Sequence, residues 1–140
     1  MLKLASFSKK IIIVASILAA IAIALGAFGA HGLKEVLSTD QLGNFQTGVR
    51  YQFYHVFALL FTALLSAYLP NTDFRWVTRF FLIGIACFSG SLYLLSTASI
   101  HSIPVGILGP ITPLGGLMFI LGWVALVVKL VRSQANEGLE

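Results

Sequence analysis

Two histidines, and the polar residues beside one of them, are the side chains best suited to chemistry in this sequence. His31 ends a glycine-rich apolar run, and Arg50, Tyr51, Gln52 and His55 lead from a polar segment into the next apolar run. Imidazoles can relay protons, bind metals or ligate haem. If the segments that carry the two histidines form antiparallel neighbouring helices, the five residues can line one pocket. They are our candidate functional pocket.

Ordinary structural roles are also open to these residues. The two imidazoles can bond carbonyls at a helix end or on a neighbouring helix, and Arg50 can bind lipid phosphate or pair with Glu35 or Asp40. His101 can reach the pocket from the turn after the third apolar run. No two histidines lie three or four residues apart, and the single Cys87 lies in the middle of an apolar run. We therefore predict no metal site and no catalytic set, and any cofactor stays unknown.

The composition points to the lipid bilayer as the solvent of these elements. The chain has 140 residues, enough for a single domain, of which 58% are hydrophobic and only 10% are charged. Soluble domains are about a quarter charged. The net charge is +4, but the basic residues are scattered among short segments without an aromatic-interleaved patch. This distribution argues against nucleic-acid binding.

Four apolar segments are long enough to cross a bilayer as helices, at ~1.5 Å of rise per residue. We predict spans at residues 11–32, 51–69, 77–100 and 113–131, with a polar outer loop at 33–50. The basic start and first apolar run also fit a signal peptide cleaved after Ala27-Phe28-Gly29. The run is longer than a usual signal sequence, and the chain is given from its first methionine, so we favour a span.

Local signals refine two of the connections. Ser38 and Gln41 have the spacing of a capping box, so a helix can start there and continue into the second span. Residues 105–111 are apolar but interrupted by two glycines and a proline, which predicts a buried loop or a shallow re-entrant piece. The last helix is expected to start at Thr112-Pro113, and the tail 133–140 is expected to fray.

Small residues recur at helical spacing in three of the spans. Such stripes allow neighbouring helix backbones to approach closely. The predicted packing positions are Ala15, Ala19, Ala22, Gly26, Gly29, Gly84, Ser91, Gly115 and Gly122.

The basic residues predict the orientation of the spans. With four spans, both tails and the middle turn lie on one side, together with Lys3, Lys9, Lys10, Arg75, Arg79, Lys129 and Arg132. The opposite side has only Lys34 and Arg50. The positive-inside rule then places both termini in the cytoplasm. The predicted fold is an all-α integral membrane four-helix bundle with up-down topology in a single domain, residues 1–140, in the cell (inner) membrane.

Several motifs resemble a known family. Residues 26–33 (GAFGAHGL), 45–55 (FQTGVRYQFYH) and 112–116 (TPLGG), followed by Gly122-Trp123, resemble the YgdD/YwdK-like inner-membrane family, a domain of unknown function numbered four-twenty-three. The resemblance covers nearly the whole chain. It implies a bacterial plasma-membrane protein with four spans, and it brings no activity, cofactor or catalytic residue.

Three functions remain as hypotheses. The first is a non-enzymatic structural or interaction protein that acts through self-association or another membrane protein. The second is a small transporter or channel that uses a polar stripe on the second span, although no span carries Asp or Glu. The third is an outer-face haem, metal or quinone site on His31 and His55.

Overall fold

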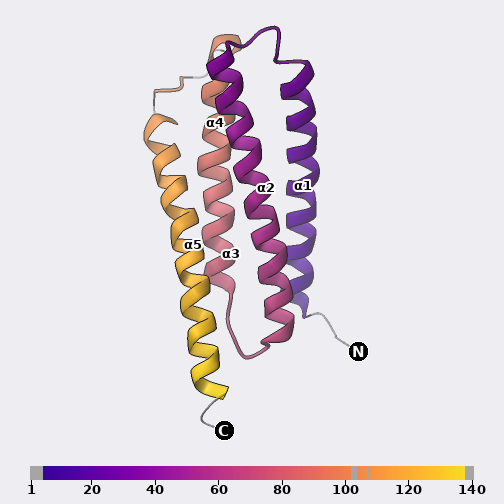
Figure 1. The fold of residues 1–140 in the computed structure, drawn as a ribbon, viewed down its shortest axis with the longest axis vertical. Coiled ribbons are helices and arrows are strands. Elements are labelled where there is room, and N and C mark those ends of the chain that lie inside the picture. Colours follow the sequence, from indigo (N-terminus) through magenta and orange to yellow (C-terminus); the bar gives the residue numbers. More distant parts are fainter. Residues whose placement is uncertain (1–4, 102–103, 107, 138–140) are drawn as a thin grey trace.

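The computed structural model describes residues 5–101, 104–106 and 108–137, and only the backbone of residues 134–137. All regular secondary structure in this part of the chain is helical. The elements are α1 (Ser6–His31), α2 (Thr39–Tyr68), α3 (Arg75–Gly84), η1 (Ile85–Ser89), α4 (Gly90–Ser96), η2 (Ala98–Ile100) and α5 (Leu108–Glu137). Figure 1 shows that α3, η1 and α4 follow one another in a single rod, in which η1 is a π-helical turn.

The long helices lie side by side (Figure 1). α1 packs chiefly on α2, while α5 packs chiefly on α3, η1 and α4. α2 is in the middle, because it also contacts α3, η1 and α4. The start of α1, the turn between α2 and α3, and the end of α5 all lie at the same end of the molecule (Figure 1).

The capping box predicted at Ser38 is confirmed. The Ser38 backbone N–H donates to Gln41 Oε1 at 2.9 Å, and the Gln41 N–H donates to Ser38 Oγ at 3.3 Å. α2 then continues to Tyr68 through Gly43 and Gly48 without a break. The polar segment is therefore mostly the first turns of α2, and only residues 32–38 form a connection. Leu33 and Leu37 fasten that connection by packing on Phe45.

The α5 side of the molecule is held together by phenylalanines that fit against glycines of the opposite helix. Gly84 faces the Phe119 ring, Gly122 faces the Phe81 ring, and Gly115 faces the backbone of Phe88. A Cβ atom at Gly122 would lie 2.5 Å from the Phe81 ring. Side chains at these positions would overlap their neighbours, so the glycines set the close approach of the two helices.

The glycines of the α1–α2 pair are less tightly packed than those on the α5 side. Ala15, Ala22 and Gly29 are buried there, and a Cβ at Gly26 would make an ordinary 3.5 Å contact with Val49. Near the chain start, Ser8 Oγ and Ser66 Oγ lie 2.7 Å apart. Small residues, this hydroxyl pair and the Phe45 ring therefore join these helices, and a Cβ at Gly29 would lie 3.1 Å from that ring.

Three helices are long and apolar enough to cross a membrane: Ser6–His31, the rod Arg75–Ser96 and Leu108–Ser133. α2 is not among them, since Gln52, His55, Thr62 and Ser66 interrupt its apolar residues. The chain is thus all-helical in its described part, with three candidate spans and a further long helix. That α2 also spans stays a prediction.

Some predicted boundaries were wrong. The expected third span 77–100 ends earlier, because its helical rod stops at Ser96 and a short 3-10 turn follows. α5 begins at Leu108, so residues 108–111 are helical and Pro113 lies inside the helix. Pro113 is the sixth residue of α5, so the helix continues there without the backbone hydrogen bond that residue 113 would donate to the Gly109 carbonyl. The tail expected to fray is helical to Glu137, while Ile107 and residues 138–140 lie outside the described residues.

Candidate functional site

The five residues predicted to form one pocket lie in separate environments. Gln52 is buried between helices: its Nε2 donates to the Leu18 carbonyl of α1 at 2.8 Å, and the Tyr93 hydroxyl of α4 donates to its Oε1 at 2.8 Å. One amide thus bonds α1 and α4 to α2. Because both ends of the amide are already paired, its role here is to fasten the helices.

His55 turns toward α5 instead. Its ring stacks on Phe119 with centroids 3.4 Å apart and planes 8° from parallel. Its Nδ1 lies 2.8 Å from the Tyr51 carbonyl oxygen, while its Nε2 is buried and has no hydrogen-bond partner among the described residues. Tyr51 packs its ring against Phe88 with centroids 4.6 Å apart.

His55 and Tyr51 line an apolar cavity of about 710 Å³ between α2, η1 and α5. Its walls are mainly aromatic and aliphatic side chains, with His55 as the buried polar group. The lining residues are Tyr51, Tyr54, His55, Phe88, Pro113, Gly116, Leu117, Phe119, Ile120 and Trp123. A cavity of this composition can hold an apolar molecule and offer it one hydrogen bond.

Arg50 and His31 are exposed and take no part in this cavity. Arg50 Nη2 donates to Thr47 Oγ1 at 3.1 Å, so the guanidinium is directed back along α2. In the described chain, neither Glu35 nor Asp40 pairs with it; the ion pair found there joins Arg75 to Asp73 at 3.8 Å. His31 lies in the last turn of α1.

The remaining candidates are also separate. His101 Nε2 is 3.0 Å from the Leu94 carbonyl oxygen, at the end of the α3–α4 rod. Cys87 is a partly buried free thiol. Among residues 5–101, 104–106 and 108–137, no group of three or more His, Cys, Asp or Glu side chains is arranged to hold a metal.

Sequence reasoning missed most of the aromatic cavity. Gln52 and His55 were expected on one side of α2, but α2 is a central helix, so side chains three residues apart meet different neighbours. Phe88, Phe119 and Trp123 were missed because single apolar residues look alike in an apolar chain. The motifs TPLGG and Gly122-Trp123 were a usable signal, since both mark the part of α5 that lines the cavity.

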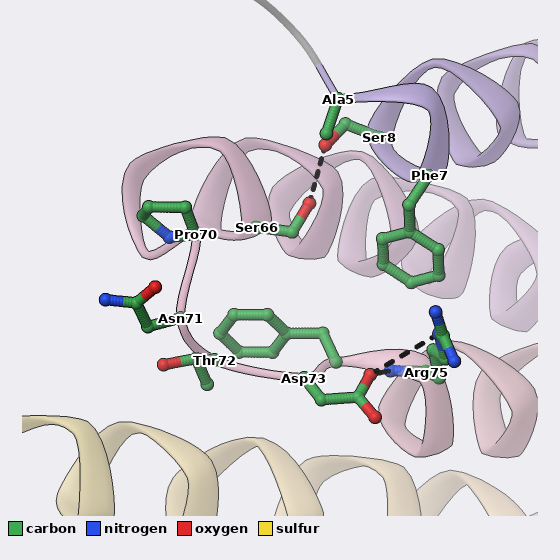
Figure 2. A pocket seen from close by; sticks show the side chains of 10 residues that line it. Ala5, Phe7, Ser8, Ser66, Pro70, Asn71, Thr72, Asp73 and Arg75 are labelled. Carbon is green, nitrogen blue, oxygen red and sulfur yellow. Dashed lines mark hydrogen bonds and ion pairs between the residues drawn. The ribbon is translucent and has the colours of Figure 1, made fainter.

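A second, smaller cavity of about 350 Å³ lies where α1 starts and α2 turns into α3 (Figure 2). Ser8 and Ser66 meet at one side of it, and Asp73 Oδ1 accepts from the Arg75 backbone N–H at 3.0 Å. Asp73 and Arg75 are largely exposed, so water competes for both charges. This cavity has the character of a surface recess between helix ends.

Comparison with known proteins agrees with the motifs noted in the sequence. The family model described as "Protein of unknown function (DUF423)" matches residues 25–116. The chain belongs to this family. The UPF0382 membrane protein YwdK of Bacillus subtilis is 42% identical over 128 residues, which cover 89% of this chain and 98% of YwdK.

Two further relatives extend this comparison. The UPF0382 inner membrane protein YgdD of Escherichia coli is 35% identical, over 89% of this chain and 92% of YgdD. A UPF0382 membrane protein of Haemophilus influenzae is 41% identical, over 81% of this chain and 86% of the relative. No solved structure matches this chain. The resemblance to the YgdD/YwdK-like family is therefore confirmed, and the chain is a membrane protein of a family whose function is uncharacterised.

Proposed function

We propose that the chain is a single four-span membrane domain, with both termini in the cytoplasm, that acts non-enzymatically by associating with other membrane helices. The observation that carries this proposal is the use of its buried polar groups. Ser8 bonds Ser66, Gln52 bonds Leu18 and Tyr93, and Ser91 bonds Thr112. These bonds join helix to helix, as polar groups commonly do in membrane bundles.

The proposal that α2 is the fourth span is supported by its pairing with α1. Gly29 is beside Phe45 and Gly26 is beside Val49, while at the other end of the pair Ser8 bonds Ser66. The two helices therefore run together along nearly their whole lengths. If α1 crosses the bilayer, α2 is carried across with it, and the hydrogen bonds made by Gln52, Thr62 and Ser66 lower the cost.

The orientation is supported by the placement of charge. At the end of the molecule where α1 and α3 begin and α5 ends, the helices carry Lys9, Lys10, Arg75, Arg79, Lys129 and Arg132. Lys34 and Arg50 belong to the other half, in the connection after α1 and the first half of α2. Lys3, which also entered the sequence-based count, lies outside the described residues. A cytoplasmic position for the basic end follows from the positive-inside rule.

Cysteine accessibility tests both the four-span topology and the cytoplasmic position of the termini. In a Cys87→Ala background, we expect the Glu35→Cys variant to react with a membrane-impermeant maleimide in intact cells. The Asn71→Cys variant should react only after the membrane is opened. Both positions are in connections between helices and are exposed. Reaction of both variants from outside would contradict the four-span topology, and the reversed pattern would contradict the orientation.

The outer face of α1 supports association through helix packing. α1 has α2 as its chief neighbour, and its exposed side has small residues at close intervals: Ser16, Ala20, Ala24 and Ala27. Such a stripe lets another helix backbone approach. A channel along α2 is less well supported, because Thr62 and Ser66 bond carbonyls of their own helix at 2.7 and 2.9 Å.

Association is tested by native mass spectrometry and cross-linking of the protein in lipid nanodiscs. We expect a complex, with itself or another membrane protein, that the Ala20→Ile variant weakens by removing the close approach. Ala86→Ile is the matched control, since Ala86 is an exposed alanine of the α3–α4 rod. A strict monomer without partners, or equal effects of both variants, would count against this function.

A further inference from the structure

The cavity beside His55 has the size and lining of a small-molecule site. Its volume of about 710 Å³ falls within the range of roughly 300–1,000 Å³ that is usual for ligand pockets. Such pockets are mostly apolar and carry a few polar groups that orient the ligand. Here the aromatic rings of Tyr51, Phe88, Phe119 and Trp123 form much of the wall, which favours a flat apolar ring as the occupant.

The hydrogen-bonding state of His55 defines what the ligand must offer. The Tyr51 carbonyl oxygen can only accept, so Nδ1, at 2.8 Å, carries the proton of the neutral imidazole. Nε2 is then left as an acceptor, and it is buried without a partner among the described residues. His55 itself is only 5% exposed. A buried acceptor without a donor is costly, and a donating ligand would remove that cost.

The π-helical turn is a second, independent sign of a functional site. η1 interrupts the α3–α4 rod at Ile85–Ser89 and contributes Phe88 to the cavity wall. Turns of this kind are rare and are frequently found at functional sites. Within the same turn, Ser89 Oγ is also buried without a partner in the part of the chain that the structure describes.

The rim of the cavity is apolar. Tyr54, Leu117, Ile120 and Trp123 line it and are between 45% and 61% exposed. With α2 and α5 in the membrane, as proposed above, this opening faces lipid. A ligand would therefore enter from the bilayer. Trp123 is 45% exposed and its ring centroid lies 6.3 Å from that of His55, so a turn of this rim side chain is the movement by which a ligand would reach the covered Nε2.

We propose that this cavity binds a lipid-soluble aromatic alcohol, a phenol or a reduced quinone, whose hydroxyl donates to Nε2 of His55. The rings of Phe88, Phe119 and Trp123 hold the aromatic body. An oxidised quinone, which has only acceptor oxygens, would leave Nε2 unpaired and bind less well. The inference rests on the proposed function only for the route of entry, so the accessibility test of topology and the binding test below can fail separately.

The first test measures binding of tritiated 1-naphthol to the full-length protein in phosphatidylcholine nanodiscs, with empty nanodiscs subtracted. The matched probe is 1-methylnaphthalene, in which a methyl group replaces the hydroxyl. We expect saturable binding of 1-naphthol and about tenfold weaker binding of 1-methylnaphthalene, because a buried acceptor left unpaired costs at least a hydrogen bond. Equal affinities, or no saturable binding of 1-naphthol, would overturn the proposal.

Two variants distinguish the contribution of the His55 hydrogen bond to binding from that of the cavity itself. His55→Phe keeps a ring on Phe119 and should lower 1-naphthol affinity about tenfold, to that of 1-methylnaphthalene. Gly116→Leu should abolish binding of both probes by filling the cavity, since a Cβ at Gly116 meets only the Phe88 ring, at 3.8 Å. His31→Phe makes the same chemical change outside the cavity and should change neither affinity. Undiminished 1-naphthol binding in the first two variants contradicts the site.

Nitrogen-15 NMR of the wild-type protein with labelled histidine gives an answer that does not depend on variants folding. Binding of 1-naphthol should shift the Nε2 resonance of His55 upfield and leave that of His31 unchanged.

A displacement experiment distinguishes which kind of hydroxyl-bearing ligand the cavity prefers. Displacement of 1-naphthol by a short-chain ubiquinol, but not by its oxidised form, supports a reduced quinone. Displacement by dioctanoylglycerol alone overturns the aromatic part of the proposal.

Discussion

The two helix pairs at the sides of this molecule use small residues in different ways. On the α5 side, glycines admit phenylalanines or the backbone of the opposite helix, as Gly84 admits the Phe119 ring. On the α1 side the glycine contacts are looser, since a Cβ at Gly29 would lie 3.1 Å from the Phe45 ring, and Ser8, Ser66 and Gln52 add hydrogen bonds. Similar residue types thus give a tightly interlocked pair and a more loosely packed pair. Shape dominates the first pair, and polar bonds contribute relatively more to the second.

This difference also separates the two proposed activities. Phe88 and Phe119, which the glycines of the α5 side position, are walls of the cavity beside His55. The interlocked pair therefore builds the candidate ligand site. The α1–α2 pair leaves the outer face of α1 free for other helices. On the two proposals above, the α5 side would bind a small molecule and the α1 side would contact other membrane helices.

The largest expected effect comes from Gly115→Ala on the α5 side. A Cβ there would overlap the backbone N and Cα of Phe88, which cannot turn away as a side chain can. Overpacking of this kind costs about 1–3 kcal/mol and occasionally more, so we expect a loss of about 3 kcal/mol in the free energy of unfolding. The measurement is SDS-induced unfolding in mixed micelles. Helix content by circular dichroism confirms that the variant starts folded.

The matched change on the α1 side is Gly26→Ala, where the added Cβ would meet Val49 at an ordinary 3.5 Å. We expect a change near zero or a gain of up to ~1 kcal/mol, because alanine is the better helix former. Equal losses from Gly115→Ala and Gly26→Ala would show that the two pairs do not differ in packing, and the comparison would fail.

The next effect in size is expected from Gln52→Leu, which tests the polar contribution. The substitution removes the bonds to the Leu18 carbonyl and from the Tyr93 hydroxyl. Each hydrogen bond of this kind is worth about 0.5–1.5 kcal/mol, so we expect a total loss of about 1–2 kcal/mol from the bond to α1 and the bond to α4 together. Gln46→Leu, an exposed glutamine on the same helix, is the control and should change little. A loss no larger than in the control would show that these hydrogen bonds do not contribute measurably to the stability of the protein.

Much of the fold was predictable because it depends on patterns that extend along the chain. Apolar runs and the Ser38–Gln41 capping box gave the helices and the start of α2. Local signals placed the start of the last helix at Thr112-Pro113 and the end of the third span at residue 100, whereas α5 begins at Leu108 and the α3–α4 rod ends at Ser96. The π turn at Ile85–Ser89 has no sequence signature that we recognised.

The candidate site was predictable only in part. His55 and Tyr51, which the sequence singled out as candidates in an apolar segment, both line the cavity. The expectation that His31, Arg50 and Gln52 join them was wrong in this structure, because it depended on which neighbour each face of α2 meets. Which helix each face of α2 contacts depends on how α5 and α4 pack on it, and residue spacing along one helix does not reveal this.

The smallest loss of stability is expected from Ser8→Ala, compared with Ser91→Ala on the opposite side. The Ser66 hydroxyl donates to the Ala63 carbonyl at 2.9 Å, so Ser8 is the donor to Ser66. Interhelical hydrogen bonds in membrane proteins average about 0.6 kcal/mol, and we expect each alanine variant to lose about that much in the same unfolding measurement. Shape would then outweigh single hydroxyl bonds on both sides, as the comparison requires. A loss from Ser8→Ala that exceeds the loss from Gly115→Ala would instead make the polar bonds of α1 and α2 the main fastening of the molecule, and the order argued for the two pairs would have to be reversed.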